Sequence, residues 1–282
     1  MRIAEVLRSH PLRERMQAYA RLARWNRPLD LFLLLWGILA ATWLASAGAP
    51  DTAALAALLI AVVLLRSAVR IWLSRLDVQE EFHPELRRVA LGVGLAGLCF
   101  ALPLGWPLLL LPLALLSIGA ALFFQRRTYL AQMGLALAVA WLVPAAYATQ
   151  AVVPGKSAWL LFLAVLFWGA ALVLLFYLPK RAADADENIL TLPMLFGSLS
   201  RPAIAGFQLL AVLSLYLLGR QSELGIFFTL GLLTAAALTG YQQYLLYYHP
   251  DREGWRLALI ANVWWGVAVF CGVAFHYLCA CS

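Results

Sequence analysis

Long apolar runs separated by short polar segments dominate the chain. A helix needs about 20 mostly apolar residues to cross a hydrocarbon core about 30 Å thick. Runs of this kind cover roughly residues 29–48, 52–73, 89–105, 107–124, 131–150, 157–178, 202–219, 223–246 and 256–278. Only Gly105-Trp106-Pro107 separates the third run from the fourth, which predicts a tight helical hairpin. The pattern predicts an all-α polytopic membrane protein with about nine transmembrane helices.

The composition excludes a water-soluble protein. Apolar residues make up 64% of the 282 residues and charged residues 12%, whereas soluble domains are about 25% charged. A disordered chain and a disulfide-stapled secreted module are excluded on the same grounds. The formal net charge is +7, but in a membrane chain the positions of the charges matter more than their sum. We therefore expect membrane lipids as partners and no nucleic acid.

Residues 1–28 form a polar leader that contains seven arginines. The leader has no apolar core and no cleavage site, so it does not resemble a signal peptide. We predict a cytoplasmic amphipathic segment on the membrane surface, ending at Pro28 because a proline disfavours helix at the residue before it. Residues 29–282 are predicted to form a single transmembrane domain.

The basic residues predict the orientation of the spans. Of 21 Lys and Arg residues, 17 fall in the leader and in the loops after spans two, four, six and eight. On the other side only Lys156 and Arg220 occur. Because cytoplasmic loops are enriched in Lys and Arg, we predict a cytoplasmic N-terminus and a C-terminus across the membrane. A bacterial inner membrane is the expected location.

Half of the 14 acidic residues lie in two loops on the predicted cytoplasmic side. These residues are Asp77, Glu80, Glu81 and Glu85 after span two, and Asp184, Asp186 and Glu187 after span six. The two loops could face each other over one cavity, although solvated loops carry charges in any case. Asp77 and Glu81 are four residues apart, and two carboxylates together with substrate phosphates are a usual way to hold Mg²⁺.

Two arginines lie inside the second apolar run. Arg66 and Arg70 share one helical face because they are four residues apart. An arginine at membrane depth is costly and normally finds a partner or a wet cavity; the alternative is that both reach the headgroups. Gln243 and Asn262, in or near the last two runs, suggest hydrogen bonds across helices.

Five stretches resemble the UbiA family of intramembrane prenyltransferases, and most closely its 4-hydroxybenzoate branch. They are RLARWNRPLDLFLLLW (21–36), LLRSAV (64–69), FFQRRTYLAQ (123–132), LPMLFG (192–197) and YQQ (241–243). The likeness runs from about residue 20 to 278 and implies a UbiA-like helical bundle.

The resemblance also implies a site. Members of this family hold Mg²⁺ and a polyprenyl diphosphate with two Asp-rich loops, and an aromatic ring attacks the allylic carbon. Carried over to this sequence, the metal and catalytic carboxylates are Asp77, Glu81 and Asp184. Arg126 and Arg127 would then bind the diphosphate. Either Arg24 or Arg27 would bind the carboxylate of an aromatic acid.

The sequence departs from both family motifs. The first, N-D-x-x-D-x-x-x-D, falls on Leu73, Ser74, Asp77 and Glu81; the second, D-x-x-Y-x-x-x-D-x-x-x-D, falls on Val173, Phe176, Lys180 and Asp184. Counting Glu81, three of the six family carboxylate positions stay acidic. The ammonium of Lys180 would repel a metal ion where the family has a ligand for it.

Three interpretations follow from this mixture of likeness and loss. We expect a catalytically impaired homologue that binds a prenyl lipid, a quinone or an anionic lipid without metal, or that scaffolds other membrane biosynthetic enzymes. Its cations would be Arg66, Arg70 and Lys180, with Arg75 and Arg181 beside them. The alternative is an active, Mg²⁺-dependent polyprenyl transferase acting on an aromatic acid such as 4-hydroxybenzoate. An unrelated transporter or assembly factor is the third, and the full-length likeness argues against it.

Overall fold

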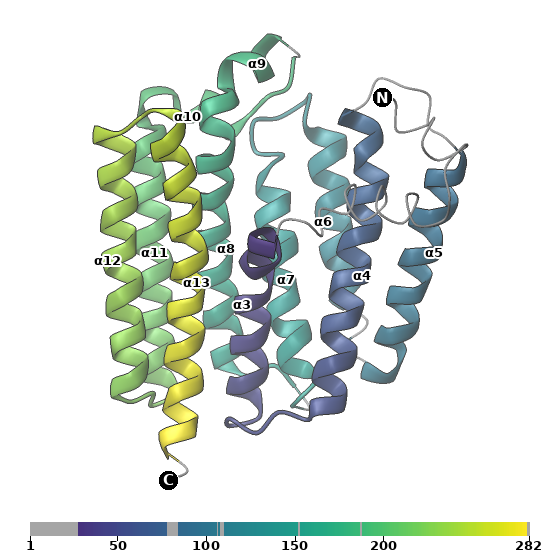
Figure 1. Ribbon diagram of the computed structural model, residues 1–282, viewed down its shortest axis with the longest axis vertical. Coiled ribbons are helices and arrows are strands. Elements are labelled where there is room, and N and C mark those ends of the chain that lie inside the picture. The colour runs from purple at the N-terminus through teal and green to yellow at the C-terminus, as the bar shows by residue number, and fades with distance from the viewer. Residues whose placement is uncertain are drawn as a thin grey trace. The chain divides into compact units, whose positions relative to one another are not determined.

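The chain folds into helices joined by short connections. The computed structural model describes residues 28–77, 84–105, 107, 110–151, 153–186 and 188–280. The long helices are α3 (Pro28–Ala45), α4 (Thr52–Asp77), α5 (Pro84–Ala101), α6 (Leu111–Phe124), α7 (Met133–Ala148), α8 (Lys156–Tyr177), α11 (Ser200–Gln221), α12 (Ile226–Tyr248) and α13 (Arg252–Ala280) (Figure 1).

Each of the nine predicted apolar runs lies largely within one of these helices, so the prediction of an all-helical membrane protein is confirmed. Within the described residues, five segments are long and apolar enough to cross a membrane, namely Thr52–Ile71, Arg87–Leu104, Lys156–Lys180, Leu192–Gln221 and Arg252–Cys279. Three shorter apolar helices accompany them. The number of nine crossings stays a prediction.

The chain divides into two compact units, and the first contains Thr52–Gly105. Its helices α4 and α5 pack against each other through glycines of α5. A Cβ atom on Gly97 would lie 3.0 Å from Cγ of Leu65, and one on Gly94 would lie 3.5 Å from Cβ of Ala68. The later α5 residue meets the earlier α4 residue, so the two helices run antiparallel.

The second unit contains Phe32–Asp51 and Trp106–Ser282. Within it, α6 packs on α7, α7 on α8, α8 on α11, α11 on α12, and α12 on α13. Helix α3 enters this unit through Trp36, whose ring centroid lies 5.4 Å from that of Trp168 on α8 and 5.3 Å from that of Trp265 on α13. All three indole rings are buried. These edge contacts of aromatic rings fix α3 between α8 and α13.

Helices α12 and α13 approach each other most closely at two glycines. A Cβ atom on Gly231 would lie 2.6 Å from the backbone oxygen of Ala268 and 3.0 Å from Cα of Gly272. In lipid, helices associate mainly by close packing, which small residues allow. The glycine pair therefore sets the separation of α12 and α13.

A chain of side-chain amides, three of them buried, joins α11, α12 and α13. Nε2 of Gln243 donates to Oε1 of Gln208 at 2.7 Å, and Nε2 of Gln208 donates to Oε1 of Gln242 at 2.6 Å. Nδ2 of Asn262 donates to the same Gln242 oxygen at 3.0 Å. The predicted hydrogen bonds of Gln243 and Asn262 across helices are thus confirmed. Gln208 and Gln242, which complete the chain, were not predicted.

Two short helices, α9 (Arg181–Asp186) and α10 (Leu192–Phe196), lie in the connection between α8 and α11. The apolar pattern did not predict them, because neither is long enough to show a helical period. Helix α8 ends just before Pro179, and Pro193 stands in the first turn of α10. Proline disfavours helix at the residue before it and suits a first turn. The two prolines therefore mark the end of α8 and the start of α10.

Candidate functional site

Three predicted site residues of the first unit, Arg66, Arg70 and Asp77, lie towards the C-terminal end of α4. Arg66 and Arg70 are half-buried on one face of the helix, and each takes part in at least one interaction. Asp77 is the last residue of α4. Arg24, Arg27 and Glu81 lie outside the described residues, as does the side chain of Asp77.

In the second unit, Arg126 and Arg127 lie in the turn that follows α6. Both side chains are exposed. The guanidinium carbon of Arg127 lies 4.4 Å from the ring centroid of Phe123, one turn earlier on α6. A guanidinium on an aromatic face keeps its N–H donors available at its edge. The turn therefore offers two cations at the end of an apolar helix.

A buried glutamine holds this basic turn against the connection that carries Asp184. Gln132 is 4% exposed. Its Nε2 donates to the carbonyl of Leu190 at 2.7 Å, and its Oε1 accepts from the backbone N–H of Leu192 at 3.1 Å. The backbone N–H of Leu190 also donates to the carbonyl of Gln125 at 2.9 Å. The structure thus brings together two segments about 60 residues apart in sequence.

Gln132 is the last residue of FFQRRTYLAQ, one of the stretches that resemble the family, but the sequence alone indicated no role for it. The available signal was a glutamine at the start of an apolar run, just after a basic turn. Such an amide has four hydrogen-bonding positions that burial requires to be largely satisfied. Its partners could not be named, because they belong to a distant segment.

Lys180 and Asp184 lie on the other side of this contact. Lys180 ends the short helix Leu178–Lys180, and its ammonium lies 3.9 Å from the ring centroid of Phe176. Asp184 lies in α9, half-buried, and takes part in at least one interaction. In the second unit, Gln132 therefore joins two segments that carry charged residues. One segment has Lys180 and Asp184, and the other has Arg126 and Arg127.

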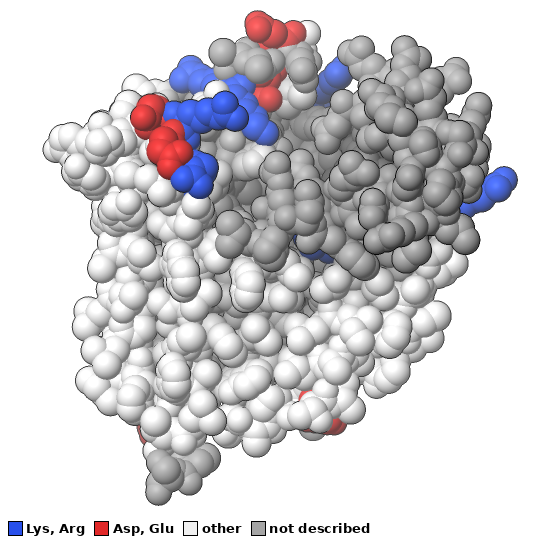
Figure 2. Space-filling model, in the orientation of Figure 1, with Lys and Arg blue, Asp and Glu red and all other residues white. Residues whose placement is uncertain are grey.

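Most of the charges of the second unit gather at one end. Figure 2 shows the blue and red side chains above the ends of α11–α13, near the connection that carries α9 and α10, while the band below is white. The white band is what a lipid-facing surface requires, because charged side chains inside the hydrocarbon region are costly. The polar end is therefore the place for a charged substrate group.

At this end, the carboxylate of Asp184 fits a magnesium ion that is held largely by its substrate. Within the described residues, no three His, Cys, Asp or Glu side chains form a group that could hold a metal by themselves. Of the two aspartates on α9, the half-buried Asp184 is the candidate ligand, whereas Asp186 is exposed. Mg²⁺ prefers oxygen ligands, and one or two carboxylates suffice when phosphates supply the rest.

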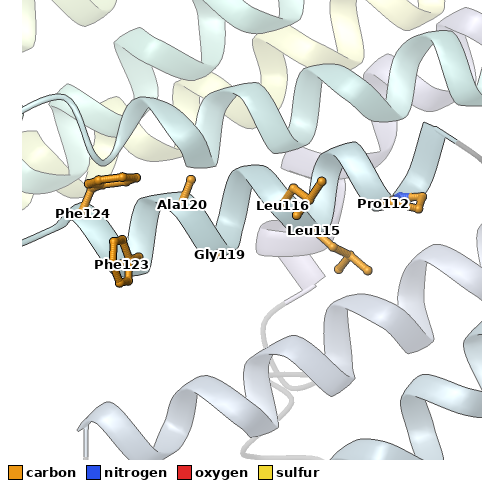
Figure 3. A pocket seen from close by; sticks show the side chains of 7 residues that line it. All are labelled: Pro112, Leu115, Leu116, Gly119, Ala120, Phe123 and Phe124. Atoms are coloured by element: carbon orange, nitrogen blue, oxygen red, sulfur yellow. The ribbon is translucent and has the colours of Figure 1, made fainter.

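An apolar hollow runs along α6 towards the basic turn. Figure 3 shows its side chains, with Pro112 at one end of the helix and Phe123 and Phe124 at the other. The lining residues are Pro112, Leu115, Leu116, Gly119, Ala120, Phe123 and Phe124. Arg126 and Arg127 follow directly in the chain. An apolar surface that ends at two cations suits a lipid with an anionic head.

Comparison with known proteins agrees with these features. The pattern of the UbiA prenyltransferase family matches residues 83–274. The 4-hydroxybenzoate octaprenyltransferase of Nitrosococcus oceani is 35% identical and covers 95% of this chain and 100% of its own. The 4-hydroxybenzoate octaprenyltransferase of Hahella chejuensis is 32% identical, and the alignment covers 94% of this chain and 93% of the relative.

Two solved structures share the fold. A structure reported for digeranylgeranylglyceryl phosphate synthase in membranes has a TM-score of 0.70 at 15% identity, covering 94% of this chain and 99% of that one. The apo structure of a UbiA homologue from Aeropyrum pernix K1 has a TM-score of 0.67 at 20% identity, covering 86% and 97%.

The apolar helices and the charged end define an integral membrane protein with an all-helical fold. The chain belongs to the UbiA prenyltransferase family. The resemblance seen in the sequence is therefore confirmed. The relatives are named as transferases, which favours the active alternative over the impaired homologue that we expected from the motifs. The matched family range begins after Glu81, so the first acidic motif lies outside it.

Proposed function

We propose that this chain transfers a prenyl group from a polyprenyl diphosphate to an aromatic acid such as 4-hydroxybenzoate, in a Mg²⁺-dependent reaction. The contact that carries the proposal is the one made by Gln132, which joins the basic turn to the segment of Asp184. The relatives named 4-hydroxybenzoate octaprenyltransferase support the choice of donor and acceptor.

In this reaction the bond between the allylic carbon and the diphosphate oxygen breaks, and a ring carbon of the acceptor forms a new bond to that carbon. The ring then loses the proton of the substituted position. Magnesium, when bound, neutralises the charge on the departing diphosphate. Asp77, Glu81 and Asp184 are the residues that would hold it.

The remaining residues bind and orient the substrates. Arg126 and Arg127 would hold diphosphate oxygens through forked N–H donors. The hollow along α6 would take the apolar chain of the donor. Arg24 or Arg27 would bind the carboxylate of the aromatic acid, and Arg66 and Arg70 would add positive charge near the first acidic loop.

The basic loops support an orientation with the N-terminus in the cytoplasm and the C-terminus across a bacterial inner membrane. This orientation would put the proposed diphosphate site on the cytoplasmic side. The prenyl chain would then extend from the polar end into the bilayer core.

Substitution of single carboxylates tests the proposal. Asp77→Asn and Asp184→Asn should each lower prenyl transfer by roughly a hundredfold, because a metal ligand contributes several kcal/mol to a charged transition state. Asp186→Asn is the matched control, since Asp186 lies on the same short helix and is exposed. Product measured by mass spectrometry should persist in the control. Equal activity in all three variants would exclude these carboxylates as ligands.

A metal-free prenyl-lipid binding protein is the second candidate, and the position of Lys180 favours it. The resemblance places this lysine where a metal ligand belongs. In that case Lys180→Asp should make lipid binding depend on Mg²⁺. An unchanged response to Mg²⁺ would count against a blocking role for the lysine.

A further inference from the structure

A second hollow lies at the polar end of the second unit, away from α6. It has a volume of about 510 Å³ and lies where α8 ends and where α11 and α13 begin. At the edge of the hollow, Gly197 turns the chain between α10 and α11 with a φ of +54°. Glycine adopts a positive φ readily because it has no Cβ atom. The lining residues are Leu178, Arg181, Gly197, Ser198, Ser200, Arg201 and Trp255.

Two arginines and a serine give this hollow its polar character. In the part of the chain that the structure describes, Arg181 and Arg201 form no ion pair, and the hydroxyl of Ser198 has no hydrogen-bond partner. The guanidinium carbon of Arg201 lies 5.6 Å from the ring centroid of Tyr247. Ten guanidinium N–H donors and one hydroxyl thus stand available around a single hollow.

The acidic residues at the start of α13 do not neutralise these cations. Oδ1 of Asp251 accepts from the backbone N–H of Gly254 at 2.8 Å. Oε2 of Glu253 accepts from Nε of Arg256 at 2.9 Å. Both carboxylates are therefore engaged within their own helix turn, which leaves the hollow with net positive charge.

Aromatic residues place the hollow at the depth of lipid headgroups. Trp255 lines it and donates its indole N–H to the carbonyl of Pro250 at 3.2 Å, and Tyr247 is half exposed beneath Arg201. Trp and Tyr gather at the membrane–water interface because their rings are amphipathic. Leu178 adds an apolar wall. A free ion in water would need none of these apolar groups.

We propose that this hollow binds the phosphate group of an anionic phospholipid. Arg181 and Arg201 would hold the phosphate oxygens, with the hydroxyl of Ser198 as a further donor. The apolar wall would contact the glycerol and upper acyl carbons. Basic pockets between transmembrane helices are a known form of lipid headgroup site.

This site is separate from the diphosphate site proposed for catalysis. Among the described side chains of that proposed site, none of Asp184, Arg126 or Arg127 lines the hollow. The neighbouring Lys180 does not line it either, since its ammonium lies over Phe176. From the sequence, we expect Arg181, among other cations, to bind an anionic lipid without metal. The hollow keeps that role for Arg181 and adds Arg201.

Native mass spectrometry of the purified full-length protein tests the proposal. The protein in detergent would be titrated with phosphatidylglycerol, with phosphatidylcholine, and with phosphatidylglycerol in the presence of excess inorganic phosphate. The wild type should retain phosphatidylglycerol in preference to phosphatidylcholine, and inorganic phosphate should not displace it. The double variant Arg181→Gln/Arg201→Gln should bind phosphatidylglycerol about tenfold more weakly, because it loses charged hydrogen bonds.

Two further variants control for charge and folding. Arg220→Gln removes one charge at the opposite end of α11 and should leave binding unchanged. Arg201→Lys keeps the charge without the fork and should retain part of the affinity. Equal binding by the wild type and the double variant, no preference over phosphatidylcholine, or displacement by inorganic phosphate would each overturn the proposal.

Discussion

The amide oxygen of Gln242 accepts hydrogen bonds from two other helices, from Gln208 on α11 and from Asn262 on α13. The side chain is 1% exposed. Gln242→Leu would leave both donors without this acceptor. We expect the free energy of unfolding to fall by about 1–2 kcal/mol, since a buried group left unsatisfied costs that order.

Thermal unfolding in detergent would measure this loss. Gln221→Leu, at the exposed end of α11, is the matched control. It should change the free energy of unfolding by less than about 0.5 kcal/mol. The double variant Gln208→Leu/Gln242→Leu should lose less than the sum of the single variants, because it removes donor and acceptor together. Additive losses would show that the two amides do not interact.

Sequence alone reached part of this residue-scale picture. Gln243 and Asn262 stood out as polar residues in or near apolar runs, which is why hydrogen bonds across helices were predicted. Gln132 and Gln208 also lie in or near such runs, but no role was assigned to them. Which amides meet depends on which helices pack together, and hydropathy carries no information about that.

At the scale of helices, Gly231 on α12 makes a close backbone approach to Ala268 and Gly272 on α13. A methyl group at Gly231 would meet backbone atoms, which cannot rotate away. Gly231→Ala should therefore destabilise the protein by about 1–3 kcal/mol, the usual cost of overpacking.

Gly240→Ala on the same helix is the matched control. Nothing lies within 4 Å of a Cβ atom at Gly240, so the alanine should be neutral or slightly stabilising because it favours helix. The melting temperatures of both variants, measured in the same detergent, test this prediction: that of Gly231→Ala should be the lower. Equal stability of the two variants would contradict the close packing of α12 and α13.

The helices themselves were largely predictable, because a span needs a long apolar run and prolines mark several ends. Helix α8, for example, was expected over 157–178 and covers Lys156–Tyr177. The short helices α9 and α10 were not predictable from the same signal. They lie in the polar connection, where the Gln132 contact rather than hydropathy holds the backbone in place.

For the whole molecule, the distribution of Lys and Arg predicts the orientation in the membrane. A reporter that is active only in the cytoplasm should work when fused after Arg127, and one that is active only outside it should work when fused to the C-terminus. The physical reason is the bias of basic residues towards cytoplasmic loops. The reverse pattern of activities would invert the predicted topology.

The count of motif carboxylates favoured the impaired interpretation, whereas the named relatives favour the active one. The count of three acidic positions in six treated the protein as the main source of metal ligands. Diphosphate oxygens and waters can supply most of the ligands of Mg²⁺, so few carboxylates suffice. The full-length similarity to transferases of 32–35% identity is the stronger guide.

The most direct measurement is a transfer assay with the purified wild-type protein. It would be incubated with a polyprenyl diphosphate and 4-hydroxybenzoate, with either Mg²⁺ or EDTA, and a known active relative would be assayed in parallel. The account predicts a prenylated product, detected by mass spectrometry, with Mg²⁺ and none with EDTA. Absence of product with Mg²⁺, while the relative is active, would contradict it and favour the metal-free lipid-binding protein.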